Sequence, residues 1–205
     1  IDMDITFSGQ EISIKSILSL IPGLYQDYLA GVTASGNVGF DGYVKGKYSE
    51  NSMPQIAANL GVENGKIQYS EYPIPIENIQ IKSNFNYPSA DLRQTSFDVD
   101  KFSMMVDREP FMATLAFKDL EDYYWKLTAD GNIDLEKILK IVPIEDTELS
   151  GKIHGKLLSE GRMSMVDNEE YEKLNTSGAI IITNLKYVST DLPRGFGISS
   201  ASARF

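Results

Sequence analysis

Most of this chain alternates apolar and polar residues one by one, and this period of two is the feature that most limits its fold. In IQIKSNFNY, Ile79, Ile81 and Phe85 alternate with Lys82 and Asn84. Successive side chains of a β-strand point to opposite faces, so the pattern predicts strands with one apolar and one wet face. Similar runs follow one another with short connections, as in an antiparallel meander. We therefore predict a mainly β protein: a curved, mostly antiparallel sheet with a few short helices that cap it.

Three local features refine this prediction. The alternation changes parity between Val99 and Phe102, which predicts a bulge or tight turn near Lys101. Residues 179–182 are apolar on both parities, which predicts a strand covered on both sides. The glycines within residues 31–46 spell no phosphate-binding loop, because no Lys-Ser/Thr follows them, and we expect them to permit strong strand curvature.

Helical spacing is confined to short segments. SIKSILSLIP and DLEKILKIVP each place apolar residues on one helical face, with Ser13 and Asp134 as N-caps and Pro22 and Pro143 as stops. A third candidate helix, DNEEYEKLN, begins at Asp167 and carries acidic residues in its first turn.

These segments belong to an internal repeat. Three matches recur in the same order: the helix from Ile14 with that from Leu135, Ser35-Gly36 with Ser150-Gly151, and KIQY from Lys66 with NLKY from Asn184. Ordered self-similarity predicts a duplicated β-rich unit, and an array that stops within its pattern suggests further units. We predict a first repeat over residues 1–120 and a second, incomplete one over 121–205. Together they would form one continuous body, a fragment of a longer protein.

Composition narrows the possible partners. The chain has 205 residues, a net charge of −10 and no cysteine. A surface this acidic repels nucleic acid and anionic lipid headgroups, so we expect neither as a direct electrostatic partner. Without cysteine there is no disulfide framework and no thiolate zinc site. No apolar run approaches the ~18 residues that span a bilayer. We expect no metal and no cofactor.

Few residues suggest catalysis. His154, the single histidine, lies on the wet parity with Lys152 and Lys156, so a catalytic triad around it is not expected. The clustered carboxylates are Asp98 and Asp100; Asp119, Glu121 and Asp122; and Asp167, Glu169 and Glu170. They could bind calcium or form a glycosidase pair, but they lack the spacing of a calcium loop, and solvated turns explain them more simply. The aromatic run over residues 123–125 could stack sugars, but at most two of its rings would share one face.

Longer segments resemble a known family. LTADGNIDLEKILKIVPIEDTELSGKIHGKLLSEG (127–161) resembles the AsmA family of Gram-negative envelope proteins, in which a strand and a glycine lead to a short helix ending at a proline, followed by a glycine-marked strand. LGVENGKIQYSEYPIPIENIQIKSNF (60–85) and TSGAIIITNLKYVSTDLPRGFGI (176–198) resemble the strand pair that follows in that family.

The resemblance implies a function. AsmA-like proteins have an inner-membrane anchor and a periplasmic body of stacked β-groove repeats, and they are linked to outer-membrane biogenesis and phospholipid transport. This chain lacks the anchor, so it would be a non-enzymatic periplasmic segment. Its expected partners are phospholipid or another acyl-chain lipid, neighbouring repeats of the same chain and envelope proteins.

The apolar parity supplies the expected groove lining, although each member could equally be ordinary core packed under the helices. The candidates are Val38, Phe40, Val44, Ile79, Ile81, Phe85, Phe97, Phe111, Leu115, Phe117, Trp125 and Leu127. Two other interpretations stay open at this point: a structural or interaction β-module of the envelope without a lipid site, and a carbohydrate-binding or hydrolase domain.

Overall fold

The described residues form ten strands and a few short helical segments. The computed structural model describes residues 1–19, 31–50, 52–70, 72–88, 91–141, 144 and 146–205. The strands are β1 (Asp2–Ser13), β2 (Val32–Lys47), β3 (Gln55–Tyr69), β4 (Tyr72–Tyr87), β5 (Ser96–Val106), β6 (Glu109–Lys118), β7 (Tyr124–Asp134), β8 (Thr147–Arg162), β9 (Asn175–Ser189) and β10 (Phe196–Arg204). The helices are α1 (Ile14–Ser19), α2 (Leu135–Ile141) and α3 (Met163–Asp167), with 3-10 turns η3 (Leu92–Gln94) and η4 (Tyr171–Lys173).

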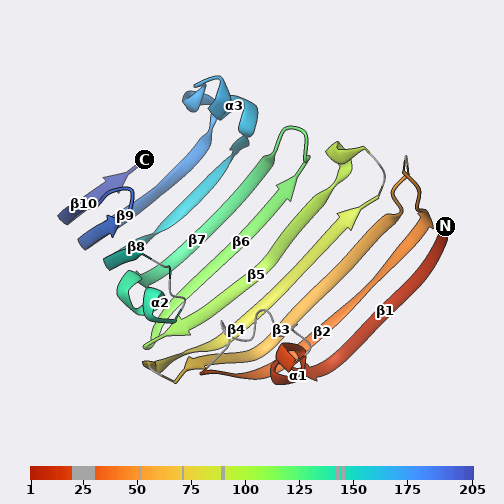
Figure 1. Cartoon of the computed structure of the whole chain (residues 1–205). Helices are drawn as coiled ribbons and strands as arrows, with labels where there is room; N and C mark the ends of the chain where they lie inside the picture. Colours follow the sequence, from red (N-terminus) through yellow and green to blue (C-terminus); the bar gives the residue numbers. More distant parts are fainter. Residues whose placement is uncertain (20–30, 51, 71, 89–90, 142–143, 145) are drawn as a thin grey trace.

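All ten strands belong to one sheet in sequence order. Each strand from β1 to β10 pairs antiparallel with its neighbours in the chain, as Figure 1 shows. The sheet is curved and does not close, so the predicted mainly β class, with a curved antiparallel sheet and a few short helices, is confirmed. The alternating directions place the odd-to-even connections at one end of the strands and the even-to-odd connections at the other.

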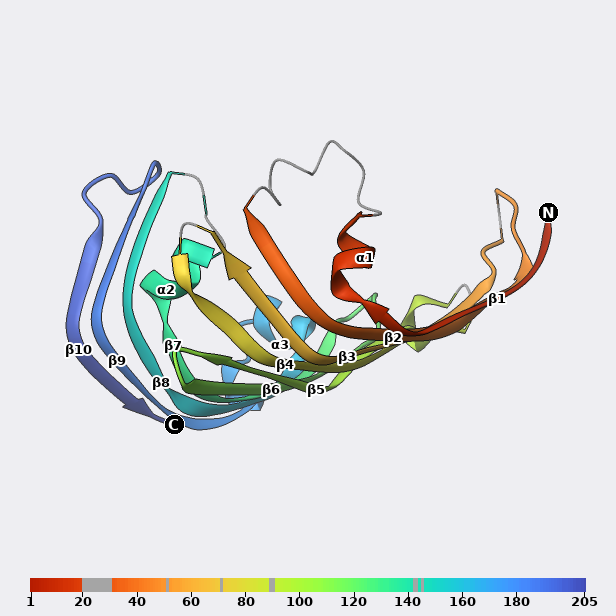
Figure 2. The ribbon, with the colours of Figure 1, turned by 90° about the horizontal axis from the view of Figure 1, so that it is seen from below.

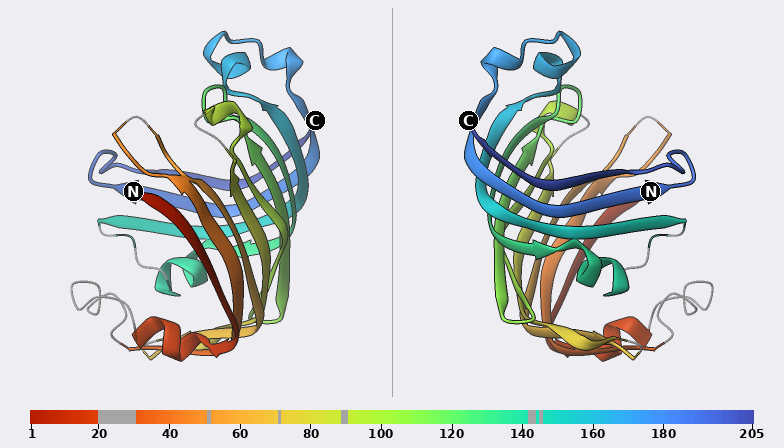
Figure 3. Two further views of the ribbon diagram at one scale, coloured as in Figure 1. Left: turned by 90° about the vertical axis from the view of Figure 1, so that its right-hand side faces the viewer. Right: turned by 90° about the vertical axis from the view of Figure 1, so that its left-hand side faces the viewer.

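The strands are bent, and the helices occupy different positions along the bend. α1 and α2 lie on the concave side, near one end of the strands (Figure 2). α3 lies at the opposite end (Figure 3). We call the end with α1, α2 and the β5–β6 turn the helical lip. The end with η3, the β6–β7 connection and the α3–η4 segment is the α3 lip.

Two glycines mark irregular points that help the strands bend. Gly36 has φ +114° and Gly151 has φ +117°, conformations that side chains rarely allow. A Cβ at Gly36 would lie 2.7 Å from the Cα of Gly65, and one at Gly151 the same distance from the Cα of Leu185. The register shifts at both glycines, so each is a bulge that only glycine fits.

The parity change in β5 is also a bulge. Lys82 pairs with Lys101 and Ser83 pairs with Val99, so Asp100 has no partner of its own in β4. The same bulge shifts the pairing of β5 with β6. The bulge predicted near Lys101 is therefore confirmed.

Two of the three predicted helices form. The backbone N–H of Ser16 donates to Ser13 Oγ (3.1 Å), and that of Lys137 to Asp134 Oδ1 (3.3 Å), so both predicted N-caps are present. The predicted stops, Pro22 and Pro143, lie outside the described residues.

The third predicted helix is wrong. A one-turn helix instead occupies Met163–Asp167, and only a 3-10 turn follows at Tyr171–Lys173. Glu169 takes a left-handed conformation (φ 58°), which ends any helix through this segment. The acidic residues in DNEEYEKLN had suggested a first turn that the backbone does not adopt.

The two copies of the repeated motif have the same strand order and local geometry. Both β1–β4 and β7–β10 contain a strand, a short helix and three further strands, and the second copy has α3 and η4 in addition between β8 and β9. Gly36 lies against Asn64 (φ 52°), and Gly151 lies against Asn184 (φ 51°). By this local geometry Asn184 corresponds to Asn64, two residues before Lys66, with which the sequence motif aligns it. The boundary at residue 120 stays a prediction.

Little of the chain is buried. The one apolar cluster of buried side chains among the described residues is Ile76, Ile79 and Val106. The accessible surface is 13493 Å², whereas a compact monomer of 22.8 kDa exposes about 9,600 Å². The prediction that residues 179–182 are covered on both sides is wrong, because Ile181 is 45% exposed and no helix or strand of the described residues lies over β9. The three isoleucines at 180–182 make both faces of β9 apolar, but an apolar sequence does not itself provide a second layer to cover them.

Candidate functional site: an open apolar concave face

The strand register aligns large apolar side chains in rows across the sheet. Phe85 in β4 pairs with Phe97 in β5, Phe97 with Phe117 in β6, and Phe117 with Trp125 in β7. Paired residues share a face. The four rings therefore form one row, which we call the aromatic row.

An aliphatic row lies beside the aromatic row, two residues nearer the helical lip. Val99 pairs with Leu115, and Leu115 pairs with Leu127. Beyond it, Ile81 contacts the buried cluster, on which Ile138 of α2 also packs. Because α2 lies on the concave side, all these rows belong to the concave face (Figure 2).

The predicted lining residues gather on this one face. The strand pairings link the rows that carry Val38, Phe40, Val44, Ile79, Ile81, Phe85, Phe97, Phe111, Leu115, Phe117, Trp125 and Leu127. Only Val38 and Ile79 among them are buried; the others keep part of their surface accessible, and Phe97 is 40% exposed.

Sequence reasoning omitted some members of the same face. Ile5 (48% exposed) pairs with Val44, and Leu60 (42% exposed) pairs with Phe40. Leu157 and Ile180 extend the face toward β10. The alternation of apolar and polar residues continues into β1, β3, β8 and β9, and following it there would have identified these residues.

The opposite, convex face is mostly polar and bears cross-strand charge pairs, although Met112 and Ile181 are exposed on it. Its ion pairs include Lys45–Asp4 (3.4 Å), Lys156–Asp130 (3.5 Å) and Lys126–Glu160 (3.2 Å). These side chains are largely exposed, so each pair adds little to stability, and their main effect is to keep this face wet. The two faces of the sheet thus differ sharply in character.

The helical lip is closed over part of the concave face. Ile138 packs on the buried cluster, and the Lys137 ammonium forms an ion pair with Asp107 in the β5–β6 turn and lies 3.8 Å from Asp134. The Lys137 side chain is only 19% exposed. α2 therefore has both an apolar contact and a charged contact with the sheet.

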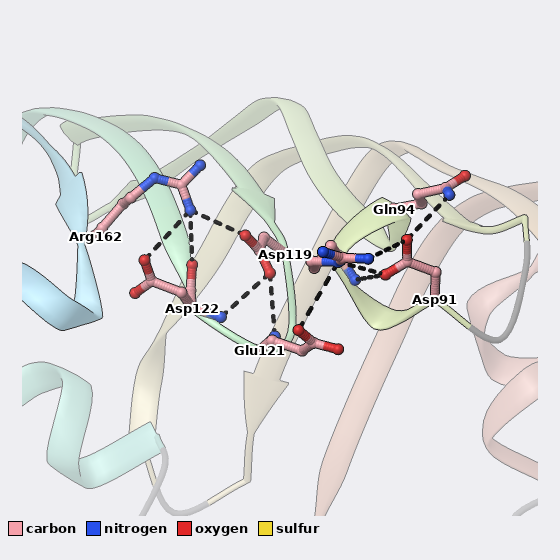
Figure 4. A network of polar contacts seen from close by, with 7 residues as sticks. Asp91, Gln94, Asp119, Glu121, Asp122 and Arg162 are labelled. Atoms are coloured by element: carbon pink, nitrogen blue, oxygen red, sulfur yellow. Dashed lines mark hydrogen bonds and ion pairs between the residues drawn. The ribbon is translucent and has the colours of Figure 1, made fainter.

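A polar network holds the α3 lip together (Figure 4). Arg162 Nη1 donates to Asp119 Oδ2 (2.9 Å) and to the backbone oxygen of Asp122 (3.1 Å). The Asp122 carboxylate accepts from the backbone N–H of Ser164 (2.9 Å), at the start of α3. The network joins the β6–β7 connection to β8 and α3.

The same contacts perturb the lip carboxylates. The pKa of Asp119 is lowered by the backbone N–H of Asp122 and by Arg162. The pKa of Asp122 is lowered by the backbone N–H of Ser164. Beside them, hydrogen bonds from Arg93 and Gln94 lower the pKa of Asp91 to about 2. Each shift has a structural cause within the lip.

The carboxylates, His154 and the aromatic run over residues 123–125 do not come together in one site. Asp119 and Asp122 are occupied by chain contacts, and within the described ranges no three His, Cys, Asp or Glu residues are grouped so that they could hold a metal ion. His154 lies exposed on the convex face with Nδ1 2.6 Å from Asn132 Oδ1. Tyr123 stacks on Phe117 (5.5 Å between ring centroids), whereas Tyr124 bonds Glu160, so the rings of residues 123–125 do divide between environments.

The hollows on the convex face are shallow. The hollow between Lys101 and Lys156, about 360 Å³ in volume, has Asp100, Asp130 and Met112 in its walls. Asp130 and Lys156 pair with each other there.

No helix within the described part of the chain has the length and apolarity to cross a bilayer.

Comparisons with known proteins found no similar family, sequence or structure. No protein-family model, no curated protein and no solved structure matches the chain.

Proposed function

We propose that this chain is a non-enzymatic segment of an AsmA-like envelope protein that binds phospholipid acyl chains on its concave face. In this role it serves outer-membrane biogenesis from the periplasm, as part of a protein anchored in the inner membrane. The envelope setting comes from the sequence resemblance over residues 60–85, 127–161 and 176–198.

The open apolar concave face carries the proposal. Monomeric soluble proteins seldom leave large contiguous apolar patches uncovered, and such patches mark binding surfaces. Among the described residues, no helix or strand lies over most of the rows between Ile5 and Ile180. The large excess of accessible surface agrees with a face that needs an occupant.

Energetics favour a weakly held lipid. Burying about ten methylenes gives roughly 8 kcal/mol at about 0.8 kcal/mol each. Association costs are of similar size, about 4–15 kcal/mol. The net affinity is modest, which suits a surface over which lipids move. No charged contact with the acyl chain is needed, so an acidic protein can fill this role.

Mass spectrometry of the purified chain tests the proposal. We expect organic extracts to contain phospholipid in near-stoichiometric amount, and a Phe85→Asp, Leu115→Asp variant to lose it. The matched control is Asn84→Asp, Met112→Asp, which adds the same charges to β4 and β6 on the convex face and should retain lipid. Absence of lipid from the parent chain would contradict the proposal.

One observation favours a second function. β1 and β10 each pair on one side only, so both edges of the sheet offer unpaired backbone groups. A structural or interaction module that joins neighbouring repeats through these edges would need no lipid. Lipid-free protein that associates through its edge strands is the outcome expected for that function.

A further inference from the structure

The two lips of the concave face differ in what covers them. Charged side chains occur at both lips, so charge alone does not distinguish them. At the helical lip, Ile138 covers Ile76, Ile79 and Val106, so the protein's own side chain fills this end. The methyl end of an acyl chain that reaches this end would contact the apolar side chain of Ile138 and would not be exposed to water.

The α3 lip ends in aromatic and polar groups. Phe97 is 40% and Tyr123 is 44% exposed, and Trp125 Nε1 donates to Ser159 Oγ (3.0 Å). Rings with one apolar and one polar side favour boundaries between apolar and wet surroundings. Behind them, Arg93 and Glu121 (3.8 Å apart) are 65% and 57% exposed and present both signs of charge to water.

The distance between these two regions suits one acyl chain. Along β4, Phe85 in the aromatic row lies six residues from Ile79 in the buried cluster, which is about 20 Å along the strand at ~3.3 Å per residue. One leaflet of a bilayer is about 15 Å thick, half of the ~30 Å hydrocarbon core. A phospholipid tail laid along the strands from the aromatic row would therefore cross the aliphatic row and cover most of the distance to the buried cluster under α2.

We propose that the concave face binds a phospholipid with its tails parallel to the strands, its polar head at the α3 lip and its methyl ends against α2. The proposal rests on the proposed function and adds the orientation of the ligand. The lip offers both charge signs and the protein is acidic, so the head that fits best is zwitterionic, such as phosphatidylcholine or phosphatidylethanolamine. Lipids of this kind would lie side by side across the strands.

The single tryptophan provides the test. Bromine quenches tryptophan emission only near contact, so phosphatidylcholine brominated close to the ester or close to the methyl end reports which part of the tail lies beside Trp125. We expect ester-proximal bromine to remove most of the Trp125 emission and methyl-proximal bromine to remove little. A second reporter, Phe111→Trp in a Trp125→Phe background, lies two residues from the start of β6 at the helical lip and should give the reverse order.

The outcomes separate the two proposals. Circular dichroism first establishes that the reporter variant folds. Equal quenching by both lipids would place the tails across the strands and overturn the orientation, and inverted quenching would put the head at the helical lip and overturn it too. Retained lipid that quenches neither reporter would also overturn it. Failure of the parent chain to retain any lipid would instead remove the proposed function itself.

Discussion

Single residues decide where the strands can bend. In β2, Gly36 has a positive φ and its missing Cβ leaves room for the backbone of β3, whereas Gly39 has neither feature: a Cβ there would lie 3.8 Å from its nearest neighbour, the backbone oxygen of Gly9. Two glycines three residues apart in one strand thus have different reasons to be glycine. The first is required by the bulge, and the second is compatible with a side chain.

We predict that Gly36→Ala lowers the free energy of unfolding by about 1–3 kcal/mol, the typical strain of a residue forced into such a conformation. Gly39→Ala is the control and should change it by much less, because the added methyl meets only ordinary van der Waals contact. Urea denaturation of the three proteins measures the difference. Equal effects of the two substitutions would show that the bulge at Gly36 is not essential.

The lip carboxylates predict a response to acid. Their pKa values are lower in the folded chain than the ordinary 3.8, so the stability they contribute is present above that pH and is lost as the pH falls through their folded values. For Asp91 this window extends from about pH 4 to about pH 2. We expect the melting temperature to fall within it, and Asp91→Asn to reduce the fall.

The measurement is a series of thermal melts between pH 5 and pH 2. Asp2→Asn at the edge of the sheet removes the same charge away from the lip and serves as the control. An unchanged pH profile in Asp91→Asn, relative to Asp2→Asn, would argue that the ionised Asp91 carboxylate does not stabilise the fold.

At the scale of elements, α2 is a short helix that packs on the buried cluster of Ile76, Ile79 and Val106. Its seven residues are too few to be stable alone, so its helical form depends on contact with the sheet. Ile138 and Lys137 supply that contact, one through the buried cluster and the other through Asp107. Both side chains therefore help to hold α2 at the helical lip.

We expect Ile138→Ala to lower the free energy of unfolding by about 1–2 kcal/mol, below the range for a fully buried isoleucine because this side chain is partly exposed. Hydrogen exchange should accelerate in α2 and at the amides of Ile76 and Ile79. Lys140→Ala, on the solvated side of the same helix, is the control. Unchanged exchange in α2 would contradict the docking role of Ile138.

At the scale of the whole molecule, the sheet is a single layer that exposes more surface than a compact protein of its size. The denaturant dependence of stability follows the surface exposed on unfolding. A chain that already exposes 13493 Å² when folded gains less on unfolding. The slope of its free energy of unfolding against denaturant concentration should therefore be smaller than that of a globular protein of equal length.

We predict an m-value in urea below that of compact proteins of about 200 residues, and a melting temperature that rises when phospholipid is added, because a ligand of the folded state stabilises it. The Phe85→Asp, Leu115→Asp variant should lose the lipid-induced rise. An m-value typical of a globular protein, with no effect of lipid, would indicate that the concave face is closed in solution.

The sequence by itself determined the strands, their faces and two of the three helices, because side-chain alternation and N-caps such as Ser13 and Asp134 act over a few residues. It also placed the bulge near Lys101 and the lining residues on one parity. It failed at DNEEYEKLN, where a single left-handed residue, Glu169, overrides the helical pattern.

Only the tertiary structure decided which part of the apolar parity is covered. Alternation gives the same pattern for a face buried under a second layer and for a face left open, because both need apolar side chains on one side. Phe97 and Ile79 illustrate this limit: both lie on the apolar parity, yet Phe97 is 40% exposed and Ile79 is 8% exposed. The bend of the sheet and the docking of α2 at one lip arise from contacts between distant strands, which no local pattern records.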